Sequence, residues 1–184
     1  MLYYRIRHPC KNYSLYSGIY EICSMVASAS IAVVFIITLL FRVVEVEGTS
    51  MHPTLRDGDI AVSVRAFFPP KRGDIVLFRK SSGARDVLVK RVIATQGQTV
   101  DIDFAEGVVF VDGEALYEPY ISVGTHLQEG VSFPCTVPEG RYFVMGDNRN
   151  RSLDSRSEEV GMVDGRRLLG IYVFGTNNLR GSRK

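Results

Sequence analysis

A serine and a histidine lie close together in the stretch GTSMHPT at residues 48–54. A serine hydroxyl becomes a useful nucleophile only when a base within hydrogen-bonding reach takes its proton. His52 is followed by proline, and its position gives no geometric reason for the ring to reach Ser50 Oγ. His126 lies in a loop-like stretch without an identifiable carboxylate to orient an imidazole. We therefore interpret both histidines as exposed or structural residues.

A lysine interrupts the apolar run VLVKRVIA at residues 87–94. The two-residue period of a strand predicts one face that carries Leu88, Lys90, Val92 and Ala94. Two interpretations of this pattern are open. The lysine stem can lie along the apolar face while its ammonium reaches water. Alternatively the amine is desolvated, which lowers its pKa and makes it a usable base near neutral pH.

The segment GDNRNRSLDSR at residues 146–156 is too polar for a core and too rich in turn formers for a strand. One interpretation is a plain surface loop. The other is a loop that carries site residues, because Asp154 and Arg156 can pair, Ser152 supplies a hydroxyl, and a predicted strand comes directly before it. Loops on a rigid β scaffold are where binding and catalytic residues are commonly found.

These three stretches need a scaffold, and the sequence after Glu47 predicts one made of strands. Short β-rich runs separated by turn residues cover residues 59–64, 74–78, 87–94, 108–111, 142–145 and 168–174. No segment of this region has a convincing amphipathic helical pattern. We therefore predict a mainly β, mainly antiparallel domain without internal repeats.

Residues 22–41 (ICSMVASASIAVVFIITLLF) contain no charged side chain. A helix of about 20 residues spans the hydrocarbon core of a bilayer, which is roughly 30 Å thick. The tripeptide at 27–29 (ASA) resembles a processing site of a cleaved signal peptide, which is the alternative. The most apolar residues, 31–41, follow that tripeptide instead of preceding it. An uncleaved membrane anchor is therefore the favoured interpretation.

The charges around the anchor predict its orientation. Three basic residues precede it, whereas acidic residues dominate the stretch that follows; the basic ones are Arg5, Arg7 and Lys11. This bias predicts a cytoplasmic N-terminus and an extracytoplasmic catalytic domain on a single-pass protein of the cell membrane. The predicted parts are a cytoplasmic tail at 1–21, the anchor helix at 22–41, the β-rich domain at 42–178 and a C-terminal tail at 179–184.

Composition excludes several classes of partner. The net charge is +2 and 23% of residues are charged, so the chain lacks the basic stripe that nucleic-acid binding needs. No Cys/His pair has zinc-ligand spacing, and we expect neither a metal nor another cofactor. Of the 3 cysteines, only Cys135 follows the anchor, so the domain has no internal disulfide, and we interpret Cys135 as a small buried residue.

Four separated motifs resemble those of the bacterial type I signal peptidases, the membrane-anchored serine proteases that remove signal peptides from exported proteins. SMHPT at 50–54 is similar to the nucleophile motif S-M-x-P-T, and KRVI at 90–93 is similar to the general-base motif. RGDIV at 72–76 resembles a further family box, and 146–156 matches G-D-N-R-x-x-S-x-D-S-R. All four occur in family order behind a suitable anchor, and the chain length resembles the small form of Gram-positive bacteria.

The resemblance implies a Ser/Lys dyad with Ser50 as nucleophile and Lys90 as general base. It implies that Ser152 helps to orient the amine, that Asp154 pairs with Arg156, and that Asp147 of the same motif supports the site. It also implies an all-β peptidase fold and acyl transfer at a peptide bond of a preprotein at the bilayer surface. Neither a metal nor nucleic acid takes part in that reaction.

Substrate pockets and the oxyanion site are less well defined by the resemblance. Family members prefer small residues at the first and third positions before the cut, and Met51 and Leu88 are candidate wall residues of the corresponding pockets. Some relatives carry a serine two residues before the nucleophile that helps to bind the oxyanion, but this chain has Gly48 there. The second oxyanion donor is therefore unassigned.

Three other functions compete with this hypothesis. Self-cleaving repressors share a Ser/Lys dyad, but they have a soluble DNA-binding region where this chain has an anchor. An organellar processing peptidase of the same superfamily is compatible with the sequence. A catalytically idle, membrane-anchored β module that binds a protein partner is disfavoured by the presence of both dyad residues and the polar loop.

Overall fold

The computed structural model describes residues 13–65, 67–80 and 87–176, in two units that divide after Leu40. The first unit contains helix α1 (Tyr13–Leu40), which is long and apolar enough to cross a membrane over Tyr16–Leu40. The helix thus begins upstream of the uncharged run at 22–41 and includes Glu21. The basic residues Arg5, Arg7 and Lys11, Cys10 and the predicted tail at 179–184 lie outside the described residues.

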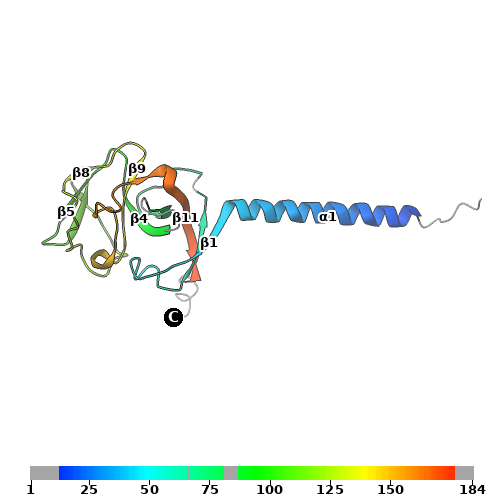
Figure 1. Cartoon of the computed structure of the whole chain (residues 1–184), viewed down its shortest axis with the longest axis horizontal. Helices are drawn as coiled ribbons and strands as arrows, with labels where there is room; N and C mark the ends of the chain where they lie inside the picture. The colour runs from blue at the N-terminus through cyan, green and yellow to red at the C-terminus, as the bar shows by residue number, and fades with distance from the viewer. Residues whose placement is uncertain (1–12, 66, 81–86, 177–184) are drawn as a thin grey trace, which may run out of the picture. The chain divides into compact units, whose positions relative to one another are not determined.

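The second unit consists of two antiparallel sheets (Figure 1). The larger sheet has the strand order β1-β2-β11-β3-β4-β9-β10. Its strands are β1 (Phe41–Glu45), β2 (Ile60–Val64), β3 (Ile75–Arg79), β4 (Val87–Thr95), β9 (Arg141–Met145), β10 (Val163–Asp164) and β11 (Leu168–Gly175). The smaller sheet, β7-β6-β5-β8, contains β5 (Thr99–Asp103), β6 (Val108–Val111), β7 (Glu114–Ala115) and β8 (Cys135–Thr136). Two short 3-10 helices are η1 (Arg149–Arg151) and η2 (Gly165–Arg167).

The predicted fold class is confirmed, and each of the six predicted strands is present within a residue or two. Two longer strands were missed. The uncharged run that predicts the anchor also covers Phe41, where β1 begins, so no separate strand signal is visible there. β5 alternates buried Val100 and Ile102 with exposed aspartates, which is a readable strand pattern that the prediction overlooked.

One hydrophobic cluster joins the two sheets. Ile93 and Phe143 of the larger sheet pack against Val100 and Val109 of the smaller one, and all four are fully buried. The remaining two clusters belong to the larger sheet and to the turn after β1. Strands β4 and β9 are thus packed on both faces of the larger sheet, since Ile93 and Phe143 belong to one cluster and Val92 and Val144 to another.

The alternation predicted along β4 is broken at its C-terminal end. Leu88 and Val92 pack in one cluster, as expected for neighbours on a single face. Ala94 instead packs with Ile93 in the cluster between the sheets. The pairing of β4 with β9 shifts register between Val92 and Ala94. The prediction that Ala94 shares the face of Lys90 is therefore wrong, because a bulge inserts an extra residue and reverses the alternation.

Candidate active site

Ser50 and Lys90 meet in the folded protein although forty positions separate them in the chain. Ser50 lies in a turn that follows β1, and Lys90 projects from the first half of β4. The Lys90 amine donates a hydrogen bond to Ser50 Oγ with an Nζ–Oγ distance of 2.7 Å. This distance allows direct proton exchange between the hydroxyl and an amine in its neutral form.

The surroundings of Lys90 favour the neutral amine. Its side chain is buried, with 2% of the residue exposed, and Val76 lies directly opposite on β3. Burial lowers the pKa of Lys90 from its usual 10.5 to about 8. The carboxylates of Asp154 and Asp147 act in the opposite direction and raise this pKa, whereas the Arg156 guanidinium lowers it. Desolvation is the larger effect, so the amine can act as a base close to neutral pH.

The two histidines do not contact Ser50 in the described structure. His52 is exposed, and its main-chain N–H donates to the Thr49 carbonyl. The His126 ring lies against Gly107 and Gly124, and its Nδ1 is 3.0 Å from the Phe104 carbonyl oxygen. His126 therefore belongs to the packing of a loop, and His52 faces solvent.

Ser152 lies beside the nucleophile without a hydrogen bond of its own. A Cβ on Gly146 would stand 2.2 Å from Ser152 Oγ and 2.4 Å from the Ser50 carbonyl oxygen. Only glycine fits there, and the absence of a side chain lets Ser152 approach the Ser50 main chain. Within the described residues, the buried Ser152 Oγ has no hydrogen-bond partner. The hydroxyl is thus close to the dyad, but no bond from it to Lys90 is formed.

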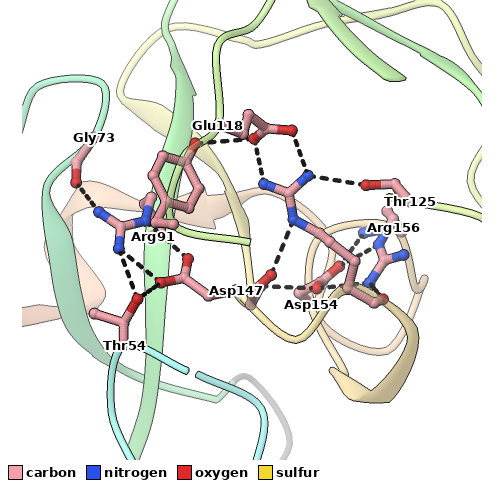
Figure 2. Close-up of polar contacts among 11 residues, drawn as sticks. Thr54, Gly73, Arg91, Glu118, Thr125, Asp147, Asp154 and Arg156 are labelled. Atoms are coloured by element: carbon pink, nitrogen blue, oxygen red, sulfur yellow. Dashed lines mark hydrogen bonds and ion pairs between the residues drawn. The ribbon is translucent and has the colours of Figure 1, made fainter. Parts of the chain in front are cut away.

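Asp147 and Arg91 form a buried cluster that joins all four of the sequence motifs (Figure 2). Arg91 Nε donates to Asp147 Oδ1 over 2.8 Å, and Nη2 donates to Oδ2 over 2.6 Å. Arg91 Nη1 donates to the Gly73 carbonyl over 2.8 Å, and the Thr54 hydroxyl donates to Asp147. The Arg91 guanidinium also lies 3.9 Å from the centre of the Tyr120 ring. These contacts tie together the nucleophile turn, the turn before β3, strand β4 and the 146–156 loop.

Asp154 and Arg156 form a second buried pair, as the resemblance implies. Arg156 Nε and Nη2 each lie 2.9 Å from a different oxygen of Asp154, and both side chains are fully buried. Asp154 also accepts from the Gly146 N–H over 3.0 Å. The pair therefore fixes the start of the 146–156 loop, where Gly146 lies against Ser50 and Ser152.

A third buried pair, Glu118 with Arg149, was missed by the sequence analysis. Arg149 donates to both oxygens of Glu118 and, over 2.9 Å, to the Thr125 hydroxyl (Figure 2). Glu118 also accepts from the Tyr120 hydroxyl over 2.9 Å. No sequence signal marks Glu118, because it lies in a polar connection and its partner is 31 residues away.

A groove of about 400 Å³ runs past Ser50 and Lys90. Its walls are residues 44–47, which include the end of β1, and residues 87–90, which begin β4. Met51 and Leu88, the predicted wall residues, both line it. Met51 is buried and Leu88 is half-buried, so both present apolar surface beside the dyad.

The backbone explains why residue 48 is a glycine. Gly48 has a φ of +86°, a conformation that side-chain-bearing residues rarely adopt. Its N–H donates to the Asp57 carboxylate over 2.7 Å and so is not available to a substrate. A hydroxyl at this position is therefore disfavoured by the turn itself, and the oxyanion donors must be sought elsewhere.

Comparisons with known proteins place the chain in a family. The profile of the family described as signal peptidase, peptidase S26, matches residues 19–175. A signal peptidase I from Bacillus licheniformis is 37% identical over 86% of this chain and 88% of its own length. Signal peptidase I T from Bacillus subtilis is 38% identical over 73% of each chain. A crystal structure of a signal peptidase I from Enterococcus faecalis covers 58% of this chain and 98% of its own at 30% identity, with a TM-score of 0.49.

Proposed function

Since the chain belongs to the signal peptidase family, peptidase S26, it is a serine endopeptidase that removes signal peptides, and we propose that Ser50 and Lys90 are its catalytic dyad. One observation carries this proposal: a buried amine with a lowered pKa donates a hydrogen bond to the Ser50 hydroxyl over 2.7 Å. No finding favours an idle β module or an organellar processing role.

The proposed reaction begins when neutral Lys90 takes the proton of Ser50 Oγ. The oxygen attacks the carbonyl carbon of the scissile peptide bond, and the negative charge moves to the carbonyl oxygen. The Lys90 ammonium then gives its proton to the leaving amine, and an ester to Ser50 remains. Neutral Lys90 next activates a water molecule that hydrolyses this ester, which releases the signal peptide and restores Ser50.

The groove supports binding of the substrate as an extended chain. Among the described residues, β1 is an edge strand that pairs with β2 alone. β4 pairs with β3 from Val87 onward, but its pairing with β9 starts only at Arg91. The groove thus lies between two strand segments that each have one unpaired edge. An extended peptide can add its main chain to such edges, while pockets beside Met51 and Leu88 select its side chains.

The 146–156 loop is proposed to support the dyad. Ser152 has an unpaired hydroxyl next to Ser50 and can accept a hydrogen bond from the Lys90 ammonium when the proton arrives. Asp147 and the Asp154–Arg156 pair hold the loop in place through buried ion pairs. The carboxylates of Asp147 and Asp154 also keep the pKa of Lys90 from falling further.

The protein is a single-pass membrane protein with α1 as its anchor. We propose that its N-terminus is cytoplasmic and that the β unit faces the other side, because Arg5, Arg7 and Lys11 precede the helix. Protease added to intact bacterial spheroplasts that express the protein is expected to digest the β unit. If the β unit is protected until the membrane is broken, the orientation is the opposite of the one proposed.

The decisive experiment uses the full-length protein in detergent and a purified preprotein with a known cleavage site. We expect Ser50→Ala and Lys90→Ala to abolish cleavage, while circular dichroism shows that both variants are folded. His52→Ala and His126→Ala serve as controls and are expected to retain most activity. Full activity of Lys90→Ala would rule out the dyad.

A further inference from the structure

Asn148 makes two hydrogen bonds to the backbone around Ser50. Its main-chain N–H donates to the Ser50 carbonyl over 3.0 Å, and its side-chain Nδ2 donates to the Thr49 carbonyl over 3.0 Å. The Thr49 carbonyl also accepts from the His52 N–H over 3.1 Å, so both of its lone pairs are used. Asn148 therefore holds both the Thr49 carbonyl, which precedes Ser50, and the carbonyl of Ser50 itself.

This arrangement determines where the Ser50 N–H points. The Thr49–Ser50 peptide is trans, since the cis bonds in the described residues are His52–Pro53 and Phe133–Pro134. In a planar trans peptide the carbonyl and the N–H point in opposite directions. Because Asn148 holds the Thr49 carbonyl, the Ser50 N–H of the same peptide unit points away from Asn148.

The groove proposed for the substrate lies along Ser50 but not along Asn148. Ser50 lines the groove, whereas Asn148 is not among the groove-lining residues. Within residues 13–65, 67–80 and 87–176, the Ser50 N–H makes no hydrogen bond, which leaves it available to a ligand. Gly48 offers no hydroxyl, and its N–H is bound to Asp57. The orientation of the Ser50 N–H thus matters more here than in a site with a side-chain donor.

We propose that Asn148 is a positioning residue that aims the Ser50 N–H at the carbonyl oxygen on which negative charge develops. The inference rests on the proposed function, because it requires Ser50 to be the nucleophile. Main-chain donors that are fixed before the reaction stabilise an oxyanion without reorganising, and loss of one such donor costs about 10²–10³-fold in kcat. Loss of its support, with the donor still present, is expected to cost about tenfold to a hundredfold.

The chain offers a matched control in the same loop. Asn150 also bonds to main-chain groups, since its Nδ2 donates to the Gly124 carbonyl over 3.0 Å and its Oδ1 accepts from the N–H groups of His126 and Leu127. These contacts hold the 124–127 stretch and do not touch Ser50. Asn150→Ala therefore removes a comparable backbone clamp away from the nucleophile.

The test measures kcat, KM, the pH midpoint of kcat/KM and the thermal unfolding midpoint for Asn148→Ala, Asn148→Asp and Asn150→Ala. We expect both Asn148 variants to lower kcat about tenfold to a hundredfold with KM changed less than about threefold. Asn148→Asp, which keeps the shape but points an oxygen at the Thr49 carbonyl, is expected to be at least as slow as Asn148→Ala. Asn150→Ala is expected to lower the unfolding temperature and keep kcat within about twofold.

Three results would overturn the inference. If Asn148→Asp is nearly as fast as wild type, Asn148 only fills space. If Asn150→Ala is as slow as Asn148→Ala, both residues only stabilise the loop. A shifted pH midpoint in Asn148→Ala, which adds no charge, would mean that Asn148 acts through Lys90 instead of through the peptide unit. Ser50→Ala and Lys90→Ala are assayed alongside, and activity in either variant would contradict the dyad itself, whatever Asn148 does.

Discussion

Two neighbouring residues of β4, Lys90 and Arg91, carry cationic side chains into very different surroundings. Arg91 meets a carboxylate through two hydrogen bonds, a main-chain carbonyl and an aromatic face. The Lys90 amine, among the described residues, has one hydrogen-bond partner, the Ser50 hydroxyl, and no ion pair. Yet Lys90 is the more deeply buried of the two, at 2% exposed against 9%.

The difference separates a structural cation, Arg91, from the proposed base, Lys90. A guanidinium cannot lose its proton in a protein, so a buried arginine must be paired, and Arg91, Arg149 and Arg156 each have a carboxylate. A lysine amine can lose its proton, and burial without a paired carboxylate promotes that loss. We therefore infer that the paired arginines serve as the framework of the site and that the unpaired Lys90 serves its chemistry.

The largest effect is expected when Lys90 is replaced by arginine, the residue type of its neighbour Arg91. Lys90→Arg keeps a positive charge, but a guanidinium cannot take the Ser50 proton, so kcat/KM should fall by about 10³-fold or more. The measurement is preprotein cleavage at saturating and limiting substrate. Arg91→Lys is the reciprocal control and is expected to lower stability more than kcat. Equal activity of Lys90→Arg and wild type would mean that Lys90 is not the base.

Removing the partner of Arg91 tests the framework. Asp147→Ala leaves a buried guanidinium without its carboxylate, and the free energy of unfolding should fall by about 3–5 kcal/mol. Chemical denaturation followed by circular dichroism measures this change. Glu139→Ala, an exposed carboxylate of the same unit, is expected to change stability by less than about 0.5 kcal/mol. Similar values for the two variants would contradict a structural role for the buried pair.

Replacing the unpaired lysine by an apolar residue should stabilise the fold. Below pH 8 the folded state must hold a buried ammonium whose pKa is about 8, whereas the unfolded chain titrates near 10.5. The unfolded state binds more protons between these values, so wild-type stability rises with pH from about 8 to 10.5. Lys90→Met is therefore expected to be about 2–3 kcal/mol more stable at pH 7, with a smaller gain at pH 10.

Denaturation at both pH values checks this expectation, with Lys71→Met as the control at an exposed position. The control should show no gain at either pH. If Lys90→Met were less stable than wild type at pH 7, burial of the lysine would carry no cost.

The smallest effect concerns the charges around the amine. The kcat/KM of wild type is expected to rise about tenfold per pH unit below pH 8 and to level off above it, because the neutral amine is the active form. Asp154 raises the pKa of Lys90, so Asp154→Asn should move the midpoint to lower pH by less than about one unit. Initial rates across pH 5–10 measure both. A midpoint that moves to higher pH would contradict this assignment of charges.

The proposed dyad could be read from the sequence because short motifs carry both residues. Ser50 lies in a five-residue motif, and Lys90 both belongs to a motif and interrupts an apolar strand, so two independent signals point to it. The pairing of Asp154 with Arg156 was predictable for a similar reason, since two positions separate them. What the sequence could not reveal was the hydrogen bond between Ser50 and Lys90, which depends on how the turn after β1 meets β4.

The framework was less predictable because its partners come from distant segments. Glu118 lies in a connection whose composition suits a surface loop, and only the fold places it against Arg149. The bulge in β4 was also hidden, since nothing at Ala94 distinguishes a regular strand from one with an extra residue. Contacts between segments far apart in the chain leave no local sequence pattern from which they could be predicted.

The sequence distance between the nucleophile turn and its supports also has a consequence for biogenesis. Thr54 and Asp147 are 93 positions apart, and Asn148 and Thr49 are 99 positions apart. Contacts of such long range form late in folding, because a large loop must close before they contribute. A nascent chain that ends before Asp147 contains both Ser50 and Lys90, yet it is expected to be inert in the preprotein assay. Proteolytic activity is thus expected only after the 146–156 segment has been synthesised.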